Sequence, residues 1–121
     1  IKTRVGHGKF KRKLEMFDCQ CKICGLKDKE LLIASHIKPW RECTDEERLD
    51  MHNGFLLCPN HDALFDKGLI SFDKEGHILI SESIANKTLE LLNIHNDIKI
   101  NVNKKNKKYL NWHRKNIFKE K

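Results

Sequence analysis

Four residues with metal-binding side chains stand in two pairs of equal spacing. Cys21 and Cys24 form a Cys-x2-Cys-Gly motif, and after 33 intervening residues Cys58 and His61 form a Cys-x2-His motif. Thiolates and an imidazole arranged in two such pairs are typical of a closed tetrahedral zinc site. We therefore predict a structural zinc ion at Cys21, Cys24, Cys58 and His61. Cys19 is an alternative to Cys21, although its Cys-x4-Cys spacing to Cys24 is less usual.

The remaining use of cysteine agrees with this chemistry. The five cysteines are an odd number, and no apolar signal segment follows the basic N-terminus, so reduced thiols in a cytoplasm are expected rather than a disulfide scaffold. No run of about 20 apolar residues is present, so we expect no membrane partner. The length of 121 residues fits a single domain. Because the chain starts at Ile1 and not at Met, we also consider a fragment of a longer protein.

Positive charge is concentrated at the two ends of the chain. The formal net charge is +7, and residues 1–13 and 104–121 hold 14 of the 24 Lys and Arg. Only one acidic residue, Glu120, lies in these two segments. Such basic ends suit a polyanion such as nucleic acid, although solvated tails have the same composition. DNA is therefore an expected partner that charge alone does not establish.

Local patterns predict the elements that would carry the motifs. An apolar run at 31–34 indicates a strand that ends near His36. The turn dipeptide Asn53-Gly54 precedes a second apolar run at 55–57, which indicates a strand that forms a hairpin with the first. Residues 61–66 then have the pattern of a short helix. The predicted order around the metal ligands is strand, loop, strand and helix.

The flanking segments predict further elements. Phe10, Leu14 and Phe17 recur at helical spacing, which predicts a basic N-terminal helix with one apolar face. Thr44 and Glu47 form a capping-box pattern for a short helical turn. Further predictions are a second hairpin over 69–80, a helix over 83–92 and a basic C-terminal helix that includes residues 109–118.

Three segments in the middle of the chain form a longer, ordered pattern. Residues 34–40 read Ala-Ser-His-Ile-Lys-Pro-Trp, residues 47–50 read Glu-Arg-Leu-Asp, and residues 53–62 read Asn-Gly-Phe-Leu-Leu-Cys-Pro-Asn-His-Asp. Together they resemble the HNH endonuclease family, in particular its restriction-endonuclease-like branch. The resemblance implies an α+β chain with a ββα-metal (His-Me finger) core over about residues 19–70 and a zinc knuckle. Basic N- and C-terminal helices and the extra β-hairpin would flank this core in one nuclease domain, 1–121.

The resemblance also implies roles for individual residues. His36 matches the family's first His, the general base that deprotonates water, and a histidine near its ordinary pKa suits this task. Asn53 matches the central Asn, which braces the loop that orients the base. Asp62 falls at the position of the catalytic metal ligand, and its carboxylate suits Mg²⁺ or Mn²⁺. In a competing alignment His61 is that ligand, and three cysteines are left for zinc.

Two classes of function remain open at this point. The first is a metal-dependent DNA endonuclease of the restriction or defence type, with double-stranded DNA as its substrate. Lys38 and Arg41 beside the base, and Lys11 and Arg12 in the first helix, are its candidate phosphate contacts. The second is a non-catalytic, zinc-stabilised nucleic-acid-binding module, which would have no use for His36. A homodimer and an upstream DNA-recognition domain are further expectations for the nuclease.

Overall fold

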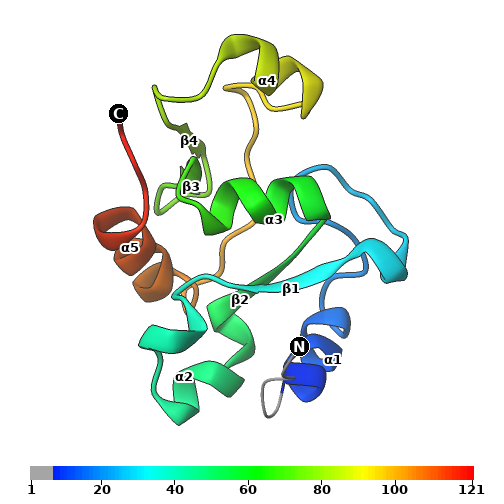
Figure 1. Cartoon of the computed structure of the whole chain (residues 1–121). Helices are drawn as coiled ribbons and strands as arrows, with labels where there is room; N and C mark the ends of the chain where they lie inside the picture. Colours follow the sequence, from blue (N-terminus) through cyan, green and yellow to red (C-terminus); the bar gives the residue numbers. More distant parts are fainter. Residues whose placement is uncertain (1–6) are drawn as a thin grey trace.

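The structure is a computed structural model that describes residues 7–121 (Figure 1). Residues 1–6, which belong to the basic N-terminal segment, lie outside the described residues. Short helices alternate with two small antiparallel sheets, so the predicted α+β class is confirmed. No helix in the described part of the chain is long and apolar enough to cross a membrane.

Two strands and one helix form the centre of the molecule. Strand β1 (Ile33–His36) pairs antiparallel with β2 (Gly54–Leu57), and His36 lies opposite Gly54. Helix α3 (Pro59–Asp66) follows β2 directly and contacts both strands. In Figure 1 α3 lies on one side of the strand pair, whereas α1 (His7–Glu15) and α2 (Asp45–Leu49) lie on the other. This arrangement is the ββα core that the HNH resemblance implies.

The connection between β1 and β2 is a long loop with its own short helices. It contains η2 (Trp40–Glu42), α2 and η3 (Met51–Asn53). The capping box that starts α2 is present, because the Thr44 side chain accepts from the Glu47 backbone and the Glu47 side chain accepts from the Thr44 backbone. The turn dipeptide Asn53-Gly54 marks the end of η3 and the start of β2, and Gly54 itself is extended.

Gly54 is required for a reason other than a turn. Its φ of −160° is open to any residue, but an added Cβ would overlap the ring of Phe10. The glycine therefore allows α1 to approach the strand pair closely. This close approach brings Phe10 to the end of β1, beside His36.

The remaining elements surround the α3 end of the core. Strands β3 (Ile70–Phe72) and β4 (Ile78–Ile80) form the predicted second hairpin. Helix α4 covers Asn86–Leu91, which is shorter than the predicted 83–92, and α5 covers Lys107–Asn116. A further short helix, η1 (Lys29–Leu31), precedes β1. Gly68, with a φ of +74°, ends the α3 region and lies against the backbone of Ile117 after α5.

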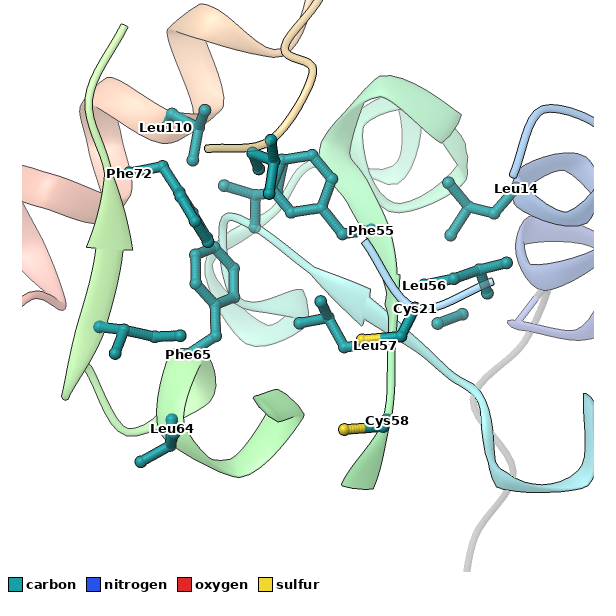
Figure 2. Close-up of a cluster of buried hydrophobic side chains, with 14 of the residues drawn as sticks. Leu14, Cys21, Phe55, Leu56, Leu57, Cys58, Leu64, Phe65, Phe72 and Leu110 are labelled. Atoms are coloured by element: carbon teal, nitrogen blue, oxygen red, sulfur yellow. The ribbon is translucent and has the colours of Figure 1, made fainter. Parts of the chain in front are cut away.

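One hydrophobic core connects these elements. Side chains from α1, β2, α3, β3 and α5 meet in it, and Figure 2 shows Leu14, Phe55, Phe65, Phe72 and Leu110 among them. Phe17 was expected on the buried face of the first helix but is 69% exposed. Since α1 ends at Glu15, Phe17 lies beyond the helix and loses the i, i+7 relation to Phe10.

Candidate active site

His36 occupies the last position of β1 and is held on two sides. Its ring stacks on the Phe10 ring with centroids 4.0 Å apart and an interplanar angle of 5°. Its Nε2 lies 2.9 Å from the carbonyl oxygen of Arg48. Because a carbonyl only accepts, the proton is on Nε2 and the lone pair is on Nδ1. The arrangement therefore fixes both the ring plane and the tautomer that a base needs.

The side chain of Arg48 fixes the carbonyl that orients His36. Its Nε donates to the Trp40 carbonyl at 3.0 Å, and its guanidinium lies 3.7 Å from the centroid of the Trp40 ring. Cation–π stacking of this kind contributes about 0.5–1 kcal/mol at exposed sites and more when desolvated. Arg48 thus fastens α2 to η2, and the backbone of α2 is held where it can accept from His36.

Asn53 braces the same loop from the other end. The side chain is fully buried; its Oδ1 accepts from the Lys38 backbone at 2.8 Å, and its Nδ2 donates to the Glu47 carbonyl at 3.2 Å. Its Nδ2 also lies 3.3 Å from Cys43 Sγ. A single amide therefore holds the segment after β1 and the end of α2 together. One residue later in α2 is the Arg48 carbonyl that orients His36.

His36 and Asp62 face one cleft of about 400 Å³ between β1, η2 and α3. Ser35, Arg41 and Asp66 also line it. Burial raises the pKa of Asp62, and the negative charge of Asp66 adds to this effect, whereas a hydrogen bond from Ser35 acts in the opposite direction. A half-buried carboxylate with a second carboxylate nearby is an environment that a divalent cation would stabilise.

The candidate phosphate contacts are in different situations. Lys38 forms an ion pair with Glu47 at 3.1 Å, and its ammonium lies 5.5 Å from the Trp112 ring centroid, so it already has partners within the protein. Arg41 lines the cleft with a side chain that is 81% exposed. Lys11 and Arg12 lie on α1 outside this cleft, and Arg12 is exposed. Arg41 is therefore the best placed of them beside His36.

The four predicted zinc ligands lie together at the opposite end of the strand pair from His36. Their ligand atoms all lie within 4.8 Å of one another; we call Cys21, Cys24, Cys58 and His61 the Cys3His cluster. The alternative ligand Cys19 is exposed and is directed to the Glu15 carbonyl instead. Cys58 is the N-cap of α3, and His61 lies in the first turn of this helix. The start of α3 therefore positions two of the four ligands.

The hydrogen bonds of the Cys3His cluster suit a soft metal ion. His61 Nε2 lies 2.9 Å from the Leu92 carbonyl, so it carries the proton and leaves Nδ1, 3.8 Å from Cys21 Sγ, as the ligand atom. Burial works to raise the pKa of Cys21, but the interaction with the His61 ring and hydrogen bonds from the backbone outweigh it and lower this pKa to about 6. Burial raises the pKa of Cys24 to about 11, as do the neighbouring thiols. The donor set therefore fits zinc.

Sequence reasoning missed two contributors to the His36 environment. Phe10 was assigned to the core, and its stacking on the imidazole was not expected. Arg48 lies in the Glu-Arg-Leu-Asp segment at 47–50, where the sequence alone indicated no role for its side chain. The small residue at Gly54, directly opposite the candidate base, is the signal that a side chain from elsewhere fills this space.

Comparison with known proteins agrees with this geometry. The family model for HNH endonucleases matches residues 21–73, which contain His36, Asn53, Asp62 and the Cys3His cluster. Among solved structures, a "Modification dependent TagI restriction endonuclease" has a similar fold, with a TM-score of 0.55 and 18% sequence identity. The similarity covers 88% of this chain and 36% of that one. No curated protein matches the chain. Residues 21–73 of the chain are therefore similar to the HNH endonuclease family.

Proposed function

We propose that this protein is a metal-dependent DNA endonuclease in which His36 is the general base. The observation that carries the proposal is the shared cleft, where His36 from β1 and Asp62 from α3 face the same space. A structural zinc module has no need for an oriented imidazole opposite a half-buried carboxylate. The match of residues 21–73 to the HNH endonuclease model supports the same activity.

The geometry supports a simple division of labour among the side chains. His36 Nδ1 takes a proton from the attacking water, while the Arg48 carbonyl and the Phe10 ring keep the imidazole in place. Asp62 would hold Mg²⁺ or Mn²⁺, and such a cation supplies neutralisation of charge on the phosphate and the departing oxygen. Arg41 would contact a phosphate beside the cleaved bond. Asn53 acts indirectly, through the loop that carries the Arg48 carbonyl.

We further propose that the Cys3His cluster holds structural zinc. The cluster ties the segment before β1 to the start of α3, and α3 carries Asp62 next to the ligand His61. Binding at such a site contributes directly to the free energy of folding. Zinc would therefore set the position of the catalytic carboxylate without taking part in the reaction.

The similar fold of a restriction endonuclease supports a proposal for the biological setting. We propose a restriction or defence role on double-stranded DNA in the cytoplasm. Since this chain spans 36% of that enzyme, the proposal includes a separate DNA-recognition domain upstream of residues 1–121. It also includes a homodimer, because a single small active site cuts one strand at a time.

A plasmid-nicking assay tests the activity. We expect the protein to convert supercoiled DNA to the nicked form with added Mg²⁺ or Mn²⁺, and not without them. DNA binding without any cleavage under both metals would favour the non-catalytic binding module instead.

Replacement of Cys58 by serine tests the zinc proposal separately. Cys58→Ser should lower the zinc content and unfold much of the protein, whereas Cys19→Ser, outside the cluster, should change neither. Elemental analysis and thermal melting measure the two effects. Unchanged zinc content in Cys58→Ser would contradict the site.

A further inference from the structure

A second cleft, of about 360 Å³, shares no lining residue with the cleft at His36. It is bounded by the end of α1, by η3 and by the segment 101–106, and we call it the His52 cleft. Its lining combines apolar groups such as Phe17 and Met51 with the polar side chains of Asn101 and Asn103.

Hydrogen bonds join the C-terminal segment to η3 and the residue before it, at the His52 cleft. Asn106 Nδ2 donates to the His52 carbonyl at 2.6 Å, and Asn103 Nδ2 lies 3.3 Å from His52 Nδ1. The Tyr109 hydroxyl donates to Asp50 at 2.6 Å, just before η3. Helix α1 packs against η3 as well. The fold therefore brings α1, from the start of the sequence, and residues 103–109, from near its end, into contact with η3 and Asp50 before it.

Basic residues are concentrated on the two elements that border this cleft, and we call these elements its two rims. In Figure 1, α1 and the start of α5 lie on either side of the chain that enters β2. The cations of the two rims are Lys9, Lys11, Arg12 and Lys13 on α1, and Lys104, Lys105, Lys107 and Lys108 at the start of α5. Among residues 7–121, no carboxylate lies within ion-pair distance of any of these eight.

The acidic groups near the cleft do not balance this charge. Asp18 is already paired with Lys22 at 3.2 Å, and Asp50 accepts from Tyr109 and from the His52 backbone. Lys107 and Lys108 also lie in the first turn of α5, where cations oppose the helix dipole and no acid is present. Two rows of unbalanced cations repel each other, and a bound polyanion would relieve this repulsion.

We propose that the His52 cleft and its two basic rims bind the DNA backbone away from the phosphate that is cleaved. The two clefts border the same loop, since η2 lines the first and η3 lines the second. As a long polyanion, DNA matches the many cations of the two rims better than a short acidic peptide does. The choice of DNA as the occupant rests on the proposed function, whereas the binding itself requires no catalysis.

Neutralisation of each rim tests this surface. The variants are Lys104→Gln/Lys105→Gln on one rim and Lys9→Gln/Arg12→Gln on the other, all at exposed positions. Lys74→Gln/Lys87→Gln is the matched control, because it removes two exposed cations from the β3–β4 turn and from α4. Affinity for a labelled DNA duplex is measured across a salt series, in buffer without added Mg²⁺ or Mn²⁺.

We expect each rim variant to weaken binding and to reduce the slope of log affinity against log salt by up to about 1.8. Each lost phosphate contact lowers that slope by about 0.9. The control should keep the wild-type slope. An effect of only one rim, or an equal effect of the control, would overturn the proposal. Rim-dependent binding by a protein that fails to nick plasmid would refute the nuclease function and leave this surface standing.

Discussion

Two histidines are held in the same way in this protein but lie in different settings. Both rings stack on a phenylalanine at 4.0 Å and 5°, His36 on Phe10 and His113 on Phe65. Both donate from Nε2 to a backbone carbonyl at 2.9 Å. The Nδ1 of His113 accepts from the Ser71 hydroxyl at 2.8 Å, whereas His36 lines the cleft that contains Asp62.

The comparison shows that one combination of contacts, a stacked ring and a backbone carbonyl, can hold either a structural histidine or a candidate base. His113 is 1% exposed, and burial lowers its pKa to about 4, so it stays neutral and joins α5 to α3 and β3. His36 is 9% exposed at the cleft. Stacking and a carbonyl fix the plane and tautomer of an imidazole in both cases. The position of the ring, at a cleft or fully buried, distinguishes the candidate base His36 from the structural tie His113.

Alanine substitutions at the two histidines should affect different properties, the nicking rate for His36 and the free energy of unfolding for His113. The loss of nicking is the largest effect that we expect. His36→Ala should lower the nicking rate by about 10²–10⁴-fold, because the imidazole is needed in the transition state, with zinc content and DNA binding nearly unchanged. His113→Ala should lower the free energy of unfolding by about 2–4 kcal/mol, since a cavity forms and Ser71 and the Phe65 carbonyl lose a partner. Its folded fraction should cut at the wild-type rate. The comparison fails if both variants show the same pattern.

Alanine at Asp62 distinguishes the base from a metal ligand. Asp62→Ala should also lose nicking activity, but high Mn²⁺ should restore part of it, because the variant lacks only affinity for the cation. No metal concentration should restore His36→Ala. Rates are measured over a Mn²⁺ titration for both variants. Rescue of His36→Ala with no rescue of Asp62→Ala would reverse the two roles.

The pH dependence of stability should report on His113. Its pKa is about 4 in the fold against 6.5 when unfolded, so the unfolded state binds the extra proton as pH falls between these values. Stability should therefore decrease from pH 6.5 to pH 4, by about 3 kcal/mol in total. Denaturant unfolding over this pH range gives the slope of stability against pH for the wild type and for His113→Asn. The difference between the two slopes reports on His113, because zinc loss contributes to both proteins alike. Equal slopes would show that His113 does not resist protonation.

Removal of each aromatic partner is the finest test of the comparison. Phe10→Leu and Phe65→Leu should each cost roughly 1 kcal/mol of stability, in the range of aromatic pairing. Only Phe10→Leu should lower the nicking rate and shift its pH profile, because the Phe10 ring stacks on His36 whereas the Phe65 ring stacks on His113. A matching shift in Phe65→Leu would mean that the two rings are not independent.

The sequence predicted the elements that depend on neighbouring residues. The capping box at Thr44 and Glu47, the strand that ends at His36 and the second hairpin are all set by short-range patterns. The same holds for the α+β class, because apolar spacing determines which segments form strands and helices. The first helix was also predicted, but its length was not, and Phe17 was therefore wrongly placed in the core.

The tertiary structure alone decided how the candidate base is held. Phe10, Arg48 and His36 come from separate segments, and no local pattern states that a ring and a carbonyl will meet the same imidazole. Gly54 shows the limit clearly, since its sequence context indicated a turn while its actual role is to make room for Phe10.

Charge shows the same division between sequence and fold. The sequence by itself determined that both ends of the chain are basic, but not that α1 and the segment before α5 border one cleft. It also could not show that Lys38 is paired with Glu47 while Arg41 stays exposed beside His36. Periodicity encodes what each segment forms, because steric and hydrogen-bonding rules act over a few residues. Which side chains meet depends on the packing of all segments at once, and only the folded chain fixes it.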